Sequence, residues 1–143
     1  MTTVEPVYTA EALSTGHGRD GHVRSTDGLV DVDVAVPKEM GGPGGATNPE
    51  ELFAAGYAAC FHSALRGVAG RAHTRLGEGT SVAARVGIGP NGAGGYGLVV
   101  ALTAHLPGLD QVEADKLVEQ AHQVCPYSNA TRGNVEVTLT TTV

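Results

Sequence analysis

Two cysteines, Cys60 and Cys125, are the side chains in this sequence best suited to chemistry. Both are expected on the apolar faces of helices, so they could meet if the two helices pack together. Two thiols can form a disulfide when their Cα atoms come within about 7 Å. The alternative is that each is a small core residue, since free cysteine is among the most buried residue types. No CxxC motif is present, which argues against a thioredoxin-like site or a zinc knuckle.

A carboxylate and two aromatic rings precede Cys60 on the same expected helix. Glu50 lies ten positions before Cys60, which leaves the two about 80° apart around the helix axis. Phe53 and Tyr57 lie between them, so a carboxylate, an aromatic wall and a thiol would form a narrow apolar slot. The simpler explanation of Glu50 is that an acid in the first helical turn favours the helix dipole.

Arg19 lies in the polar segment HGRDGHVRSTDG, before the first long strand that the sequence predicts. A thiolate in an apolar slot needs a cation, because burial alone raises the pKa of a thiol. An arginine held by Glu50 could be that cation. A solvated surface charge is the alternative, and the spacing along the chain does not decide between them.

The remaining motifs point less clearly to chemistry. Six histidines are scattered without HExxH or another tight ligand spacing, so we expect no metal site. The segment GGPGGATN is similar to a phosphate-binding loop but contains neither GxxxxGK[ST] nor GxGxxG. Ser63 and Ser128 lack a nucleophile-elbow sequence. A small-ligand or phosphate-binding module with structural cysteines therefore remains an alternative function.

Two helices are expected to carry the cysteines. The first begins at TNPEELF, with Asn48 as its N-cap, and runs to about Gly70. The second begins near Asp110 and ends where Pro126 follows Cys125. Each has apolar residues at three- and four-residue spacing, so each should bury one side.

Alternating apolar and polar residues predict the strands. A Gly-rich turn, GPNGAGG, joins two of them into a β-hairpin. The order of strands and helices favours an α+β domain with an antiparallel sheet, and the length favours a single domain over residues 1–143. The expected strands are residues 29–36, 80–88, 96–106 and 134–143, with a weaker one at 4–10.

Composition excludes several classes of partner. The net charge is −6, and the nine basic residues form no run that could follow a phosphate backbone, so nucleic acid is not expected as a partner. The sequence has no apolar stretch of 18 residues and no signal-peptide pattern, so we expect no membrane association and a cytoplasmic protein. In that compartment the two cysteines would be thiols rather than a permanent disulfide.

Three segments closely resemble the organic hydroperoxide resistance proteins, a branch of the osmotically inducible protein (OsmC) family of thiol peroxidases. They are GRDG at Arg19, GGATNPEELFAAGYAACF around Cys60 and VCPYSNATRGN around Cys125. The similarity runs from about Val7 to the C-terminus. It implies an OsmC-like fold with antiparallel sheets packed around two central helices, in an intertwined homodimer with two active sites at the subunit interface.

The resemblance also implies the role of each catalytic residue. Cys60 would attack the organic hydroperoxide and become a sulfenic acid, and Cys125 would resolve it as a disulfide. Arg19 and Glu50 would match the family's paired Arg and Glu beside the thiolate. No cofactor is implied, and the reductant would be a dihydrolipoyl group on a lipoylated protein or another dithiol. A redox sensor that passes oxidation to a partner remains an alternative.

Four aromatic residues are candidates for the apolar wall of a substrate pocket. Such a wall would favour an alkyl or fatty-acid hydroperoxide over hydrogen peroxide, because each buried CH₂ contributes about 0.8 kcal/mol. The four are Phe53, Tyr57, Phe61 and Tyr127.

Overall fold

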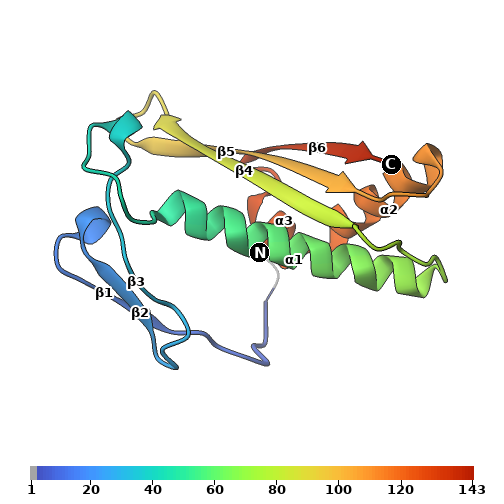
Figure 1. Ribbon diagram of the computed structural model, residues 1–143, viewed down its shortest axis with the longest axis horizontal. Helices are drawn as coiled ribbons and strands as arrows, with labels where there is room; N and C mark the ends of the chain where they lie inside the picture. Colours follow the sequence, from blue (N-terminus) through green and yellow to red (C-terminus); the bar gives the residue numbers. More distant parts are fainter. Residues whose placement is uncertain (1–2) are drawn as a thin grey trace. The chain divides into compact units, whose positions relative to one another are not determined.

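The computed structural model describes residues 3–143, and the backbone contacts divide the chain into two compact units (Figure 1). The first unit extends to Pro49, and the second is Glu50–Val143. Both cysteines lie in the second unit. The first unit contains the strands β1 (Ala12–Thr15), β2 (His22–Ser25) and β3 (Asp31–Asp33), with the short 3₁₀ helices η1 (Gly18–Asp20) and η2 (Lys38–Met40).

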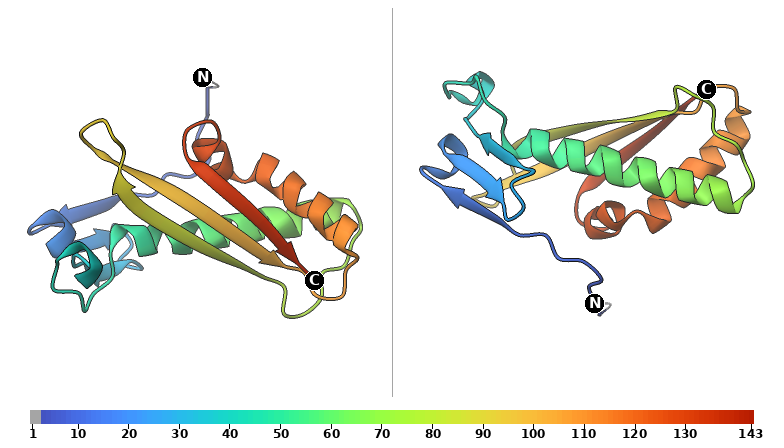
Figure 2. Two further views of the ribbon diagram at one scale, coloured as in Figure 1. Left: turned by 90° about the horizontal axis from the view of Figure 1, so that it is seen from above. Right: turned by 60° about the horizontal axis from the view of Figure 1, so that its bottom comes forward.

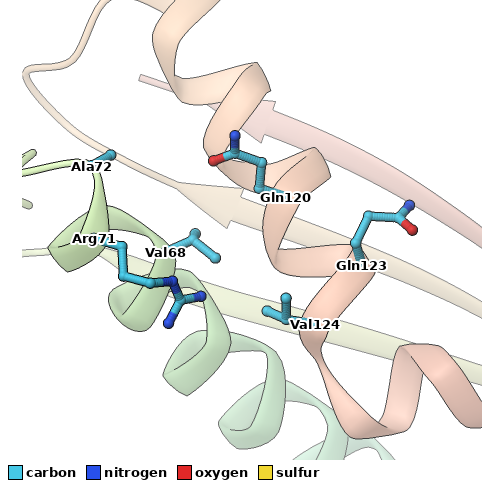
Figure 3. Close-up of a pocket in the computed structure, with 6 residues that line it drawn as sticks. All are labelled: Val68, Arg71, Ala72, Gln120, Gln123 and Val124. Atoms are coloured by element: carbon cyan, nitrogen blue, oxygen red, sulfur yellow. The ribbon is translucent and has the colours of Figure 1, made fainter.

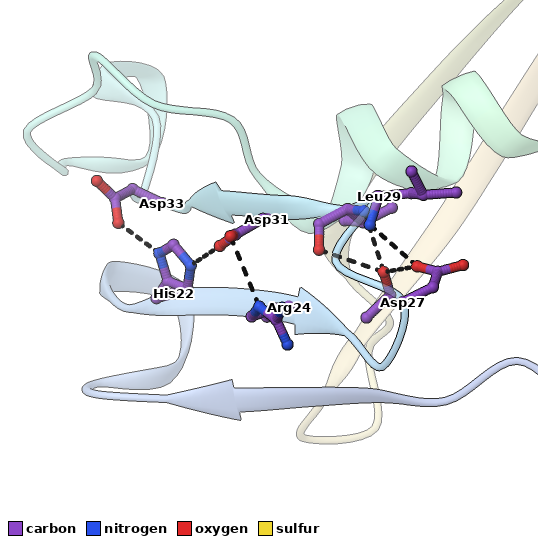
Figure 4. Close-up of polar contacts among 8 residues, drawn as sticks. His22, Arg24, Asp27, Leu29, Asp31 and Asp33 are labelled. Carbon is purple, nitrogen blue, oxygen red and sulfur yellow. Dashed lines mark hydrogen bonds and ion pairs between the residues drawn. The ribbon is translucent and has the colours of Figure 1, made fainter.

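The first unit is built on an antiparallel sheet in the order β1-β2-β3. Polar side chains connect β2 to β3 (Figure 4). Nδ1 of His22 lies 2.7 Å from Asp33, and its Nε2 lies 2.6 Å from Asp31. Arg24 lies 3.6 Å from the same Asp31 carboxylate. The two strands are therefore joined by charged groups as well as by backbone hydrogen bonds.

The predictions for the first unit were partly wrong. No strand forms at residues 4–10, whose apolar side chains Val4, Val7 and Tyr8 are exposed. The expected strand at 29–36 is reduced to β3. The strands β1 and β2 form instead within segments that show no inward-facing apolar alternation. β1, for example, is exposed along its whole length.

The second unit contains three helices and one sheet. The expected helices and hairpin are confirmed there, with bounds within one or two residues of those predicted. Asp110 caps the second helix by accepting a hydrogen bond from the backbone N–H of Glu113 at 3.3 Å. The elements are α1 (Pro49–Arg71), β4 (Ser81–Pro90), β5 (Tyr96–His105), α2 (Gln111–Val124), α3 (Pro126–Thr131) and β6 (Glu136–Thr142).

The sheet of the second unit is mixed rather than wholly antiparallel, which corrects the prediction. Its order is β4-β5-β6, and β4 pairs with β5 in the antiparallel sense. The last strand, β6, pairs with β5 in parallel, from Val99↔Glu136 to His105↔Thr142. The chain crosses through α2 and α3 before β6, and a helical crossover brings a strand back in the same direction.

The core of the second unit lies between this sheet and the helices, which pack on one of its faces (Figure 2). The alternation in β5 buries Val100, Leu102 and Ala104 toward the helices. Leu65 of α1 and Leu117 of α2 belong to the same cluster. This core fixes which face of each helix points inward. Residues three or four apart on that face therefore pack against the same part of the core. No helix among the described residues has the length and apolar character needed to cross a bilayer.

Candidate active site

The structure brings the two cysteines together. Sγ of Cys125 lies 3.6 Å from Sγ of Cys60, although the residues are 65 positions apart in the chain. Both cysteines are free thiols. Their separation is larger than the bond length of about 2.05 Å in a disulfide, but small enough for a disulfide to form after a local adjustment.

Cys125 owes its position to the proline that follows it. Pro126 has no N–H to continue α2, and Cys125 adopts an extended conformation (φ −62°, ψ 124°). The prediction that Pro126 ends the helix is confirmed. Pro126 also begins α3, a helix that the sequence analysis missed, so Cys125 lies between two helices rather than at a free end.

The two thiols differ in exposure. Cys125 is fully buried, whereas Cys60 is half-buried and faces an open cavity of about 420 Å³. Ser63, Gly67 and Pro126 are among the residues that line this cavity. Of the two thiols, Cys60 is therefore the one that a small molecule can reach.

Burial raises the pKa of the Cys60 thiol above its ordinary value, and the neighbouring Cys125 raises it further. A hydrogen bond from the backbone N–H of Tyr127 opposes this by stabilising the thiolate. This N–H belongs to the first turn of α3, so the same short helix that follows Cys125 also donates to Cys60.

Three aromatic rings pack together beside the thiols. The ring centroids of Phe53 and Tyr57 are 6.0 Å apart, those of Phe53 and Tyr127 are 5.8 Å apart, and those of Tyr57 and Tyr127 are 5.6 Å apart. Phe53 and Tyr127 are partly exposed, but Tyr57 is fully buried. Phe61 is also fully buried, in the core cluster. None of these four aromatic residues is among those that line the cavity at Cys60.

The Tyr57 hydroxyl belongs to a buried polar cluster that the sequence analysis did not identify. It lies 2.8 Å from Oγ of Ser128 and 3.1 Å from Oγ1 of Thr131. Nδ1 of His122 lies 2.8 Å from the same Ser128 oxygen. The sequence offered one signal, namely two small hydroxyl residues three and six positions after Cys125.

The two charged residues proposed for the site, Arg19 and Glu50, lie in elements other than the segments that contain the two cysteines and the Tyr127 donor, or at the far end of the helix that carries Cys60. Arg19 is half-buried in η1 of the first unit. Glu50 is half-buried in the first turn of α1. Its ten-residue separation from Cys60 corresponds to about 15 Å along the helix axis. The backbone of α1 therefore places Glu50 almost three turns from the thiol.

His62, two residues after Cys60, has a buried Nε2 with no hydrogen-bond partner among the described residues.

The cavity at Cys60 adjoins a second cavity of about 450 Å³ between the end of α1 and α2 (Figure 3). Arg71 and Val124 line both cavities, so the open space continues from the thiol along the groove between the two helices. Among the described residues, no group of three or more His, Cys, Asp or Glu side chains could hold a metal ion.

Known proteins resemble this chain in sequence and fold over nearly its whole length. Residues 42–140 match the family model described as OsmC-like protein. The organic hydroperoxide resistance protein of Xanthomonas axonopodis pv. citri (strain 306) is 53% identical over 142 residues, covering 98% of this chain and 99% of that protein. The crystal structure of an organic hydroperoxide resistance protein from Legionella pneumophila matches with a TM-score of 0.92 and 54% identity, covering 97% of this chain and all of that one.

Proposed function

We propose, from the premise that this chain belongs to the OsmC-like protein family, that it protects against organic hydroperoxides by reducing them to alcohols. The observation that carries the proposal is the pair of free thiols 3.6 Å apart, one facing a cavity and the other buried. The names of its relatives supply the substrate class.

The more accessible thiol performs the first step. The Cys60 thiolate attacks the distal oxygen of the hydroperoxide, so that an S–O bond forms and the O–O bond breaks. The sulfur is oxidised to a sulfenic acid, and the alkoxide leaves and takes up a proton to become the alcohol. We assign Arg19, oriented by Glu50, to favouring the thiolate and stabilising the departing alkoxide.

The buried thiol performs the second step. Cys125 attacks the sulfenic sulfur, an S–S bond forms, and the hydroxyl leaves with the thiol proton as water. A dithiol such as a dihydrolipoyl group on a lipoylated protein then restores both thiols by exchange and is itself oxidised to a disulfide. Such a cycle suits the reducing cytoplasm, in which we place the protein.

The preference for organic peroxides rests on the apolar surface near Cys60. Phe53 and Tyr127 are partly exposed, so an alkyl group could contact them. Tyr57 and Phe61 are fully buried, so they would support this wall from behind rather than touch the substrate. Catalytic efficiency should therefore be higher for cumene hydroperoxide than for hydrogen peroxide.

The test is a thiol titration before and after one equivalent of cumene hydroperoxide, with wild type, Cys125→Ser and Cys60→Ser. Wild type should lose both thiols rapidly, and Cys125→Ser should retain a trapped sulfenic acid at Cys60. Cys60→Ser should keep the Cys125 thiol. Loss no faster than that of a free thiol would contradict the proposal. Rapid loss without turnover on a dihydrolipoyl substrate would instead indicate a redox sensor.

A further inference from the structure

Four polar side chains, three of them buried and His122 half-buried, form a hydrogen-bonded cluster near the two cysteines. The mechanism above assigns no role to their polar atoms. Tyr57 comes from α1, His122 from α2, and Ser128 and Thr131 from α3. Tyr57 and Ser128 are fully buried, and Thr131 is only 3% exposed. The cluster therefore joins all three helices of the second unit at one point in its interior.

The spacing along the helices places this cluster one turn from the thiols. Tyr57 precedes Cys60 by three residues on α1, and Ser128 follows Cys125 by three residues. Tyr57 and Cys60 lie on the same face of α1, because residues three apart on a helix share a face. Cys125 is the N-cap of α3 and directly precedes the turn that contains Ser128. The Tyr57–Ser128 contact of 2.8 Å and the Cys60–Cys125 contact of 3.6 Å are therefore neighbouring contacts across the same helix interface.

Hydrogen bonding makes this interface sensitive to displacement. A buried hydroxyl that loses its partner is left desolvated without a compensating hydrogen bond, which destabilises the displaced arrangement. A shift of α3 along α1 would break the Tyr57 contacts with both Ser128 and Thr131. His122 adds a third point of attachment, because its Nδ1 lies 2.8 Å from the Ser128 hydroxyl. The cluster thus favours one position of α3 relative to α1 and α2.

The position of α3 matters for both sulfur atoms. Cys125 directly precedes α3, and the backbone N–H of Tyr127 in its first turn donates to the Cys60 sulfur. A displaced α3 would move Cys125 away from its target and would remove a donor from the Cys60 thiolate.

We propose that Tyr57, Ser128 and His122 are positioning residues that hold α3 so that Cys125 closes rapidly onto oxidised Cys60. This proposal depends on the proposed function when the oxidised form of Cys60 is a sulfenic acid produced by a hydroperoxide. In that closure the S–O bond of Cys60 breaks, the S–S bond forms, and hydroxide leaves with the Cys125 proton as water. The same closure occurs on a mixed disulfide of Cys60 with glutathione, where Cys125 displaces the glutathione thiol.

The experiment follows closure separately from the first oxidation. Wild type, Tyr57→Phe and Ser128→Ala are treated with cumene hydroperoxide, and the sulfenic acid and disulfide are resolved in time by quenching and mass spectrometry. Tyr96→Phe is the matched control, because Tyr96 is 72% exposed at the start of β5. We expect closure to slow about tenfold or more in the first two variants, with a smaller effect on sulfenic acid formation at a pH where Cys60 is fully ionised. The control should match wild type in both steps.

Two further measurements distinguish positioning from a general loss of structure. The pH profile of Cys60 alkylation should move to higher pH in Tyr57→Phe, because the Tyr127 donor is displaced, and should not move in Tyr96→Phe. His122→Asn keeps a hydrogen-bonding atom near the Nδ1 position and should retain closure within about threefold. His122→Leu should slow closure like Ser128→Ala.

Closure at the wild-type rate in folded Tyr57→Phe and Ser128→Ala would overturn the proposal. So would an equal effect of His122→Asn and His122→Leu. Oxidised glutathione provides the test that is independent of peroxides: if cumene hydroperoxide fails to oxidise even the wild type, the proposed function is wrong. A tenfold slower displacement of glutathione in Tyr57→Phe would then still support the positioning role.

Discussion

The reactive thiol at Cys60 is subject to opposing influences from its nearest neighbours. Burial raises its pKa most strongly, the Tyr127 N–H lowers it, and Cys125 raises it again, with a net shift upward. Peroxide reduction requires the thiolate. The second unit by itself therefore favours the unreactive form of Cys60, and the proposed chemistry requires a cation to reverse this preference.

Arg19 is our candidate for that cation, and its removal should be visible in the titration of Cys60. We expect Arg19→Ala to raise the pKa of Cys60 further and to lower the rate of its oxidation by cumene hydroperoxide at pH 7 by about tenfold or more. Arg24→Ala is the matched control, because Arg24 lies in the same unit and pairs with Asp31. The measurement is the pH dependence of Cys60 alkylation in a Cys125→Ser background. Equal profiles for both arginine variants would exclude Arg19 from this role.

The His22 side chain provides a second prediction at this scale, in the first unit. Its hydrogen bond to Asp33, and to a smaller extent its hydrogen bond to Asp31, raise the pKa of the imidazole above its ordinary value of 6.5. Protonated His22 therefore stabilises the β2–β3 pair below pH 6.5, and this contribution is lost as the pH rises through the raised pKa. In an NMR titration, Asp33→Asn should lower the pKa of His22. Asp27→Asn should not, because Asp27 contacts Ser25 and Leu29 instead.

The pKa of His122 is shifted in the opposite direction. Burial and the nearby Arg132 lower it below 6.5, while Glu119 acts weakly against them. The folded state therefore disfavours the protonated form, so stability should fall as the pH drops from above 6.5 through the lowered pKa. We expect acidification from pH 7.5 to pH 5 to change the denaturant midpoint less unfavourably in His122→Asn than in wild type. An unchanged pH dependence in the variant would show that His122 does not contribute.

At the scale of single elements, two of the three glycines in α1 have sharply different surroundings. A Cβ at Gly56 would lie 2.9 Å from the Tyr127 hydroxyl and 3.3 Å from its ring, whereas a Cβ at Gly70 would meet nothing within 4 Å. Glycine within a helix costs about 1 kcal/mol relative to alanine. Gly56 therefore leaves space for the Tyr127 ring at the expense of helix stability.

This contrast predicts different outcomes for the same substitution. Gly70→Ala should raise the free energy of unfolding by about 0.5–1 kcal/mol and leave peroxide reduction unchanged. Gly56→Ala should displace the Tyr127 ring from Phe53 and reduce the catalytic efficiency for cumene hydroperoxide severalfold. Denaturant unfolding and steady-state kinetics measure the two effects. Full activity in Gly56→Ala would show that the position of the Tyr127 ring does not matter for the substrate.

Local sequence signals predicted the elements of the second unit better than those of the first. The Asp110 cap and the alternation in β4 and β5 are strong short-range signals, and these elements formed as expected. The strand β1 is exposed and depends on its pairing with β2, which no local pattern reveals. The direction of β6 was also unpredictable, since alternation specifies which side chains face inward but not whether pairing is parallel.

At the scale of the whole molecule, the candidate site depends on contacts between distant parts of the chain. The types and helix faces of Cys60 and Cys125 were readable in the sequence, but their approach across 65 residues follows from packing. Tyr57 was expected in a substrate wall because its ring is apolar. Its hydroxyl instead forms a hydrogen bond with Ser128. Ser128 lies in α3, which was not predicted because Pro126 was interpreted only as the end of the preceding helix. Such pairings require the tertiary structure.

The same long-range contact predicts a coupling between redox state and stability. A disulfide between Cys60 and Cys125 would close a long loop in the unfolded chain, because the two residues are 65 positions apart. The loss of chain entropy in a loop of that length stabilises the folded state by about 4 kcal/mol when the native geometry accepts the bond without strain. Guanidinium unfolding of the oxidised protein should therefore require more denaturant than unfolding of the reduced protein. Cys125→Ser should unfold at the same midpoint with and without reductant. An oxidised form no more stable than the reduced one would mean that closing the 3.6 Å gap strains the helices by a comparable amount, and the disulfide would then be readily reduced.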